Sequence, residues 1–572
     1  MTSTRIAAAL ALAASTSACT ARRAPDAAAA VGPAATSPAI STEDVRRRIE
    51  ILSDDSTQGR DAGSEGALRA ARYLERELRR MGLEPAGDGG SYFQRIPLVV
   101  RTPDSASALR AGASTLAYGT DFVPLPRLGV QLFLGGQPFG GTFAGENVPT
   151  VYGGTVGQEG TLAPEAARGK VVVFSTARGA NGQPMLAFWQ RDNLARYAGA
   201  AAVLVTMLDA GNPPALRAPR DYYDDAAKPW PLALPVIGVT SAAAARIFGG
   251  TPLASLAVGA AGAPLSGRTG FVDRATAAPA LNVVAVLRGR DPRLRGSYVA
   301  VGAHYDHVGM SARPFDHDSI RLYNSVVRPR GADDPARPPT PDEVARVRAL
   351  LDSVRALRPP RPDSVFNGAD DDASGTALML EIAEAFAPAG ARPKRSLLFV
   401  FHTAEEKGLY GAQYYSDHPT VARDSIVAQI NMDQMGRGGP EDVPPLPPNG
   451  LVVIGARRLS TELGDLAESL NRRPEHGFAL DYAFDRDGDP LNAYCRSDHY
   501  MYARYGIPVV FYSGAAYHKD YHMVSDESQY VDHPRTARIG RYVADVVAAV
   551  ANLDHRPVVD KPKPDPNGGC QQ

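Results

Sequence analysis

Cysteine is scarce in this chain, long apolar runs are nearly absent, and the charges almost cancel. Of three cysteines only Cys495 and Cys570 lie beyond residue 19, so neither a disulfide framework nor a structural zinc site of the CxxC type is expected. These two distant thiols could pair or stay free, and the sequence leaves both open. After the N-terminal segment, no apolar run approaches the roughly 20 residues that cross a bilayer as a helix.

The near balance of charge argues against one broad class of partner. Basic residues number 61 and acidic residues 62, which disfavours nucleic acid or an anionic membrane surface as the main partner. Specificity is therefore expected to come from a site. The length of 572 residues predicts two or three structural units and leaves the oligomeric state open.

Residues 1–19 have the layout of a secretory signal peptide. One arginine precedes an Ala/Leu-rich stretch from Ile6 to Ala14, and small residues lead to Cys19. The run 16–19 resembles a bacterial lipobox, although Thr16 stands where that pattern prefers Leu. We expect an exported protein, either a periplasmic or outer-membrane lipoprotein anchored to the membrane at Cys19 or a soluble periplasmic or secreted form. Residues 20–41, rich in Ala, Pro, Thr and Ser, predict a flexible tether.

The remaining chain predicts an α/β unit interrupted by a mainly-β one. The α/β unit begins with residues 42–100, which include an amphipathic helix that starts near Ser64 and ends at Gly82. Residues 101–278 contain short apolar segments separated by Gly and Pro and no histidine, which is typical of an inserted accessory domain without a metal site. Residues 279–557 resume the α/β unit, and residues 558–572 form a C-terminal tail.

Strand-like and helical patterns alternate after residue 279. This alternation predicts an α/β fold in which helices flank a mixed, largely parallel sheet. Ligands of such folds bind at the carboxyl ends of the strands, and the polar clusters of this sequence fall there. The predicted strands are 281–287, 298–303, 396–401, 426–431, 451–454 and 508–512, and the predicted helices include 374–386 and 535–553.

Five polar clusters lie next to these elements, and each taken alone has an ordinary structural interpretation as surface residues or a helix cap. A helix cap, however, needs only one of three adjacent aspartates, and adjacent anions repel one another unless a cation offsets them. Where two glutamates are consecutive, one can bind a metal while the other acts as a general base. The clusters are His304-Tyr305-Asp306-His307, Gly368 to Gly375 with its three aspartates, His402 to Gly408 with Glu405 and Glu406, Asn431-Met432-Asp433, and Tyr521-His522.

Taken together, the clusters supply two histidines and three carboxylates to one edge of the predicted sheet. Mixed nitrogen and oxygen ligands suit zinc, with cobalt or manganese as substitutes. Five ligands with one shared carboxylate suit two Zn2+ ions about 3.5 to 4 Å apart, bridged by a water, which is a hydrolytic arrangement. Asp306 can hold the second ring nitrogen of the first histidine. The pattern leaves open which of the three aspartates and which of the two consecutive glutamates binds.

In order along the chain, these clusters resemble the dinuclear zinc aminopeptidase family, whose relatives include glutamate carboxypeptidase, glutaminyl cyclase and the inactive transferrin receptor. The resemblance extends from Ile51 to about Leu553, and residues 101–278 resemble a protease-associated domain. It implies an exopeptidase acting on peptides with a free N-terminus. For the site it implies the metal ligands His304, Asp371, Glu406, Asp433 and His522, with Asp371 as the bridge between the metals. It also implies that Glu405 is the general base, that Asp306 supports His304 and that Tyr521 stabilises the oxyanion.

Three alternatives remain at this stage. A carboxypeptidase would need a basic residue for the terminal carboxylate, and Arg321, Arg496 or Arg504 could serve. A glutaminyl cyclase would be expected to retain fewer ligands, and a receptor-like binding protein to have lost a ligand or the base. Because the ligand set is complete, hydrolysis is favoured. Residues 308–366, with a predicted helix at 341–357, form an insert that is longer than in many relatives and predicts a lid or an ordered pocket wall.

Overall fold

The structure is a computed structural model that describes residues 36–125, 141–156, 159–177, 194, 196–209, 217–225, 234–439, 442–443, 445–515, 517–570 and 572. The predicted signal peptide, its Cys19 and most of the predicted tether lie outside the described residues. Among the helices that are described, none is long and apolar enough to cross a membrane.

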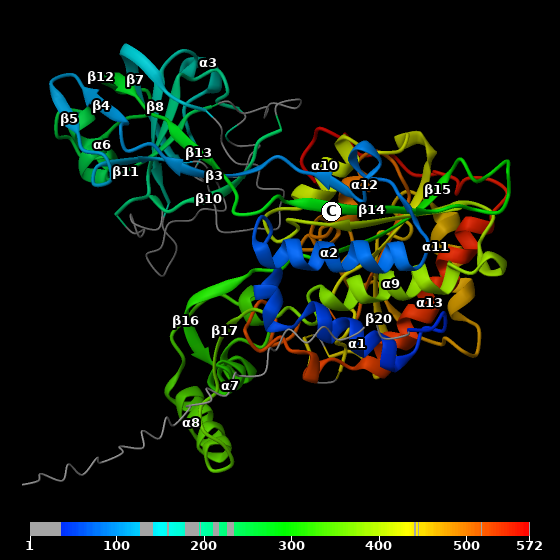
Figure 1. The fold of residues 1–572 in the computed structure, drawn as a ribbon. Helices are drawn as coiled ribbons and strands as arrows, with labels where there is room; N and C mark the ends of the chain where they lie inside the picture. The colour runs from blue at the N-terminus through cyan, green and yellow to red at the C-terminus, as the bar shows by residue number, and fades with distance from the viewer. Residues whose placement is uncertain are drawn as a thin grey trace, which may run out of the picture. The chain divides into compact units, whose positions relative to one another are not determined.

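A mixed sheet forms the centre of the α/β unit (Figure 1). β18, β15, β19 and β22 run parallel to one another, whereas β14 and β20 flank them in the antiparallel sense. The predicted fold class, a mixed sheet with a parallel centre, is confirmed. In spatial order the described strands are β1 (Glu84–Pro85), β14 (Leu281–Leu287), β18 (Ser396–His402), β15 (Tyr298–His304), β19 (Ile426–Met432), β22 (Val509–Ser513), β20 (Gly450–Ile454) and β21 (Ala479–Asp481), and β2 (Phe93–Arg95) also pairs with β14.

Helices cover both faces of this sheet because its central strands are apolar on both sides. Along β14, Val283 and Ala285 pack into the core on one face, while Val284 and Val286 pack into the core on the other. The first face is covered by α1 (Thr42–Leu52), α2 (Glu65–Arg80), α9 (Ala373–Phe386), α11 (Thr461–Asn471) and α13 (His533–Asn552), and the second by α10 (Tyr410–Asp417) and α12 (His499–Ala503).

Local sequence signals set the ends of several helices. α2 begins after Ser64, whose side chain accepts a hydrogen bond from the backbone N–H of Ala67, and it ends just before Gly82, which has a φ of +75°. Such caps satisfy backbone groups that have no partner inside the helix. The predicted helix from Ser64 to Gly82 is confirmed.

The chain leaves the central sheet after β2 and returns to it at β14, and the residues between form other sheets. The larger contains, in spatial order, β5 (Ser114–Leu116), β4 (Ala108–Ala111), β12 (Ala261–Arg268), β7 (Ala144–Val156), β8 (Val171–Thr176), β9 (Ala202–Thr206), β11 (Val236–Val239) and β6 (Phe122–Pro124). The smaller contains β10 (Arg220–Tyr223), β3 (Leu98–Pro103) and β13 (Phe271–Ala275), and the described helices here are the short α3 (Pro164–Ala167) and α6 (Ser241–Ile247). The mainly-β character is confirmed, while the domain boundaries and the likeness to a protease-associated domain stay predictions.

The insert at residues 308–366 is ordered and has its own secondary structure. β16 (Met310–Asp316) pairs with β17 (Pro362–Val365), and α7 (His317–Val327) and α8 (Pro341–Arg355) lie between them in the chain. Thr340 and Glu343 form a reciprocal capping box at the start of α8, which accounts for the predicted helix in this position.

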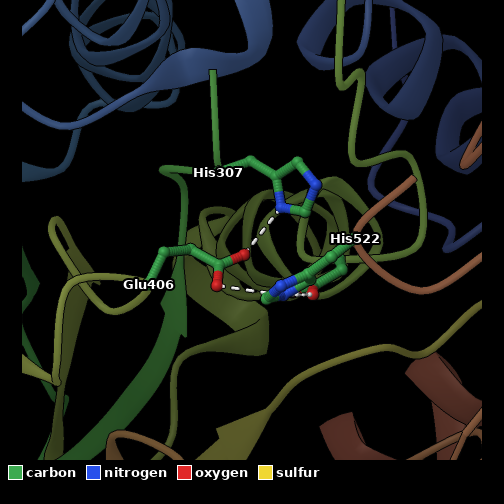
Figure 2. Close-up of side chains that lie close together, drawn as sticks. His307, Glu406 and His522 are labelled. Atoms are coloured by element: carbon green, nitrogen blue, oxygen red, sulfur yellow. Dashed lines mark ion pairs between the residues drawn. The ribbon is translucent and has the colours of Figure 1, made fainter. Parts of the chain in front are cut away.

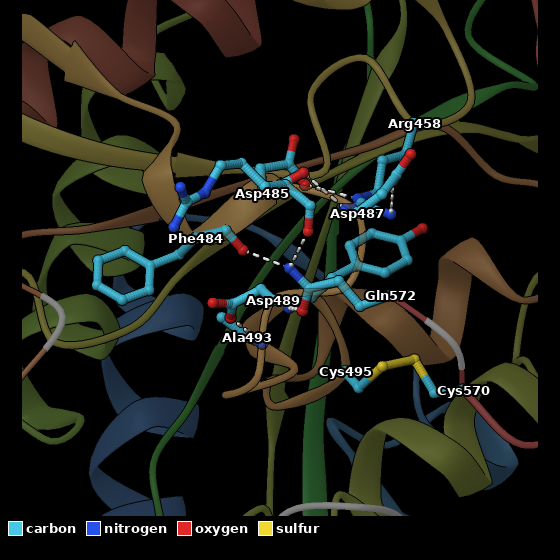
Figure 3. The surroundings of a disulfide bond; sticks show 11 residues. Arg458, Phe484, Asp485, Asp487, Asp489, Ala493, Cys495, Cys570 and Gln572 are labelled. Carbon is cyan, nitrogen blue, oxygen red and sulfur yellow. Dashed lines mark hydrogen bonds and ion pairs between the residues drawn. A yellow bond between two sulfur atoms is a disulfide. The ribbon is translucent and has the colours of Figure 1, made fainter.

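Cys495 and Cys570 form a disulfide, which resolves the alternative that the sequence left open (Figure 3). The bond ties the C-terminal tail to the turn that precedes α12. Close by, the Gln572 side chain accepts a hydrogen bond from the Tyr494 N–H and donates one to the Phe484 carbonyl. Cys570 and Gln572 are therefore fixed to the segment 484–495 by covalent and polar contacts.

Candidate metal centre

The sequence-predicted ligands converge at the carboxyl ends of the parallel strands. His304 is the last residue of β15, Asp433 directly follows β19, and Glu406 lies in the turn after β18. Asp371 comes from the turn before α9, and His522 from the loop after β22. Parallel neighbouring strands end at the same edge of a sheet, so residues far apart in sequence meet there.

His304, Asp371 and Asp433 form a first group of possible metal donors. The Nε2 atom of His304 lies 3.2 Å from Asp371 Oδ1 and 3.5 Å from Asp433 Oδ1. Its Nδ1 atom lies 3.1 Å from the backbone carbonyl oxygen of Asp306 and 3.8 Å from the carboxylate of that residue. Asp306 therefore contacts the ring through its carbonyl, and this contact turns Nε2 toward the two aspartates.

Asp371, Glu406 and His522 form a second group, to which the structure adds His307. The Nε2 atom of His522 lies 3.0 Å from Asp371 Oδ2 and 3.0 Å from Glu406 Oε2, and His307 Nδ1 lies 2.7 Å from Glu406 Oε1. Figure 2 shows both imidazoles directed at the Glu406 carboxylate. Asp371 thus contributes one oxygen to each group, which is the geometry of a bridging carboxylate.

His307 belongs to the polar cluster after β15 but was not predicted as a site residue. It lies three positions beyond His304, where the chain has left the strand, so strand periodicity gives no direction for its side chain. Its ring is fully buried. Gly368 makes room for it, because a Cβ atom there would lie 2.5 Å from the His307 ring and 2.2 Å from the Asp371 carbonyl.

The three adjacent aspartates have three different partners. Asp372 caps α9 by accepting a hydrogen bond from the Gly375 N–H at 2.8 Å. Asp370 lies 3.2 Å from the Nε2 atom of His518, and Asp371 alone faces the donor groups. The three adjacent negative charges are therefore each offset by a different group: Asp372 by the start of α9, Asp370 by an imidazole, and Asp371 by the donor groups.

Buried donor atoms and their electrostatics fit a cation. Within the described part of the chain, His304 Nε2, Asp433 Oδ1 and both Glu406 carboxylate oxygens are buried and face the imidazole nitrogens and carboxylate oxygens of the donor groups. Burial opposes the charge on His304, yet the carboxylates of Glu405 and Asp433 outweigh it and raise its pKa well above the usual value. Such surplus negative charge around nitrogen and oxygen donors suits a zinc-type ion.

Glu405 and Tyr521 lie beside the donor groups without belonging to them. The Glu405 carboxylate is buried and lies 3.9 Å from His304 Nε2, and its backbone N–H donates to Asp306 Oδ1. Burial, together with neighbouring carboxylates, raises the pKa of Glu405 well above its usual value. The Tyr521 ring stacks on His522 with centroids 4.0 Å apart.

Two buried residues that sequence reasoning missed hold the donor loops. Arg60, which is fully buried, donates to the backbone carbonyls of Leu52, Tyr305, Asn367 and Gly368. Asp526 accepts hydrogen bonds from the backbone N–H groups of Asp370 and Asp371. In the sequence each is simply a charged residue in a loop, where charged residues are usually exposed to water. Nothing in the sequence distinguishes these two buried residues from exposed ones.

The segment 497–499 lies beside the donor groups, and Ser497 contacts them directly. Its hydroxyl donates to Asp433 Oδ2 at 2.8 Å, and Ser497 lines a pocket beside the donor groups together with Asp371, Glu405 and Asp433. The next residue, Asp498, lies 3.0 Å from the Nδ1 atom of His402. The segment therefore holds one donor and one residue at the end of β18.

Comparison with known proteins gives a family match over the α/β part. Residues 282–547 match the model of Peptidase family M28. Leupeptin-inactivating enzyme 1 of Streptomyces exfoliatus is 32% identical over 161 residues, which are 27% of this chain and 32% of that protein. A probable aminopeptidase of Saccharomyces cerevisiae is 30% identical over 133 residues, which are 22% of this chain and 33% of that protein. The matches therefore span about a third of the length of these curated relatives.

Solved structures are similar over a longer range at low identity. The aminopeptidase from Aneurinibacillus sp. strain AM-1 is 16% identical, with coverage of 92% of this chain and 97% of that one and a TM-score of 0.45. The zinc aminopeptidase of Bacillus subtilis is 15% identical, with coverage of 92% and 99% and a TM-score of 0.43.

Proposed function

Because residues 282–547 belong to peptidase family M28, we propose that this chain is a zinc-dependent aminopeptidase that removes the N-terminal residue of peptides. One observation carries the proposal. Two donor groups share Asp371, and Glu405 faces the same space without belonging to either group.

The donor groups suggest how two metal ions would be held. His304, Asp371 and Asp433 would hold one Zn2+ ion, and Asp371, Glu406 and His522 the other. Two zinc ions in such a site supply Lewis acidity, which polarises the scissile carbonyl and acidifies a water. His307 contacts Glu406 and would fix the orientation of that carboxylate.

The remaining residues move or stabilise charge. Glu405 would accept a proton from the attacking water and return it to the departing amine. The Asp306 carboxylate holds the backbone of Glu405, so the base has a defined position. Tyr521 is placed beside His522, where its hydroxyl would donate to the oxygen that becomes negatively charged.

Charge in the site favours a substrate amine over a substrate carboxylate. The three arginines considered for carboxypeptidase action each lie beside an aspartate: Arg321 at 3.1 Å from Asp520, Arg496 at 3.0 Å from Asp333 and Arg504 at 2.5 Å from Asp417. Asp371 and Asp433 would be bound to metal, so Glu405 is the lining carboxylate that lies outside both donor groups and that a substrate ammonium would approach. This supports aminopeptidase over carboxypeptidase action.

An exported location is part of the proposal. It rests on the signal-like residues 1–19, and the Cys495–Cys570 disulfide is the kind of bond that persists in oxidising compartments. Anchoring through a lipid on Cys19 would be tested by mass spectrometry of the mature N-terminus. A mature protein that begins with an unmodified Cys19, or that begins after residue 19, would contradict lipid anchoring.

The activity is tested with matched peptides that carry free or acetylated N-termini. The zinc-loaded mature protein should shorten only the free peptides, one residue at a time, as followed by mass spectrometry. C-terminal shortening would replace the proposal with a carboxypeptidase. N-terminal pyroglutamate formation would indicate a cyclase, and no change in any peptide would favour a binding protein.

A further inference from the structure

The pocket beside the donor groups is largely apolar but includes one arginine. Its apolar wall is formed by Val452, Ile454, Phe484, Phe511 and Tyr517, and Arg496 is the cation among the lining residues that the structure describes. An apolar side chain would gain free energy by leaving water for such a wall. A guanidinium in the same wall would instead attract an anionic side chain. Whether the charge of Arg496 is compensated therefore decides which substrate side chains the pocket accepts.

Arg496 is paired on two sides. Its Nη1 atom donates to the Tyr517 hydroxyl at 2.6 Å, and its Nη2 atom donates to Asp333 Oδ1 at 3.0 Å. The side chains of Arg496 and Asp333 are only 15% and 17% exposed. In such a shielded position the carboxylate compensates most of the positive charge, and its removal would leave the guanidinium uncompensated.

Asp333 belongs to the insert and not to the α/β unit that carries the donor groups. It ends the short turn Gly331–Asp333 between α7 and α8. The backbone fixes this turn against the site, because Ala332 N–H donates to the Tyr521 carbonyl at 3.0 Å. Gly331 has a φ of +58°, and a Cβ atom there would lie 2.5 Å from the Tyr521 carbonyl oxygen, so close approach requires glycine.

The neighbouring Asp334 has a different partner. It pairs with Arg330, which lies four residues earlier in the same turn, at 2.8 Å. The two adjacent aspartates therefore differ in which arginine they neutralise, and only Asp333 neutralises a residue of the pocket wall. This makes Asp334 a matched control.

We propose that Asp333 is a specificity-determining residue: by pairing with Arg496 it neutralises the guanidinium of the apolar wall, so that the enzyme selects apolar N-terminal side chains and rejects acidic ones. The inference rests on the proposed aminopeptidase function and adds its substrate class. An acidic side chain would have to displace Asp333 from Arg496, and a basic one would be buried beside a guanidinium. Both lose free energy relative to an apolar side chain.

The test compares peptides that differ only in an N-terminal Leu or Glu. Asp333→Asn keeps the size of the side chain and removes its charge, so kcat/KM for Glu relative to Leu should rise by about tenfold or more, as expected for a shielded charge that gains a new partner. Asp334→Asn should leave the ratio unchanged. Adding Arg496→Met to Asp333→Asn should abolish the gain, because the cation is then gone.

Binding of the free amino acids tests the inference without turnover. By isothermal titration calorimetry, Asp333→Asn should bind glutamate more tightly relative to leucine than the unmodified protein does. An unchanged ratio in both kinetics and binding, or a gain that persists in the double variant, overturns the inference. If the unmodified protein releases no N-terminal residue, the proposed function fails, and the binding ratio still decides whether Asp333 controls the charge of the pocket.

Discussion

Replacing Glu405 with glutamine should leave zinc binding nearly intact and lower kcat about 10²- to 10⁴-fold, the usual contribution of a general base. Glutamine has nearly the same shape, so the backbone hydrogen bond from residue 405 to Asp306 should persist. The amide cannot accept a proton at neutral pH. Glu405 lies outside both donor groups, so the change removes no proposed ligand.

The adjacent residue provides the matched comparison. Glu406 lies 3.0 Å from His522 and 2.7 Å from His307 and belongs to a donor group. Glu406→Gln replaces an anionic ligand with a neutral one, so zinc affinity should fall by more than the 10- to 100-fold that loss of an outer partner costs. The two variants should therefore lose activity for different reasons, one through loss of the base and the other through loss of metal.

Metal content and turnover separate the two variants. Each protein would be dialysed against a zinc buffer, its metal measured by inductively coupled plasma mass spectrometry, and its kcat measured on one peptide. Glu405→Gln should keep the metal content of the unmodified protein, and Glu406→Gln should lose part of it. Near-normal turnover of Glu405→Gln, or equal metal loss in both variants, would refute the assigned roles.

Three further predictions concern stability and are checked by thermal or denaturant unfolding. Arg60→Met removes four buried hydrogen bonds and should lower the free energy of unfolding by about 4 kcal/mol or more. Arg69→Met removes one exposed hydrogen bond to a backbone carbonyl and should change the free energy of unfolding by about 0.5 kcal/mol or less. Equal effects of the two substitutions would contradict this prediction. Cys570→Ser opens a loop with a sequence separation of 75 and should cost about 4 kcal/mol, and an unchanged melting temperature in oxidising buffer would argue against the disulfide. Burial opposes ionisation of Asp318, but hydrogen bonds from Arg361 and Arg358 outweigh this effect and lower the pKa of Asp318 to about 2. Its contribution to stability should therefore be present above pH 4 and be lost as the pH falls through about 2, so the stability difference between Asp318→Asn and the unmodified protein should shrink over that range.

Much of the fold could be read from local patterns. β14 was predicted at 281–287 and occupies those residues, and α13, predicted at 535–553, spans His533–Asn552. These elements were accessible because apolar periodicity and end signals act over a few residues. The convergence of the five predicted ligands also followed, because residues at the ends of parallel strands share one edge of a sheet.

Contacts between segments that are distant in the sequence could not be predicted from local patterns. His307 enters the second donor group through the fold of the turn after β15, and the support that His304 receives from Asp306 comes from a carbonyl, which every residue has. The pairing of Cys495 with Cys570 depends on where the C-terminal tail returns. Spacing along the chain does not encode any of these distances.

The sequence by itself determined the α/β class, the strand ends and the chemical types of the donors, because these depend on side-chain identity and short-range periodicity. Only the tertiary structure decided which atoms face one another. It alone paired Arg496 with Asp333 and placed Arg60 beneath the donor loops. A charge in a loop looks the same in sequence whether it remains in water or is buried against a partner hundreds of residues away, and burial is what gives it a role.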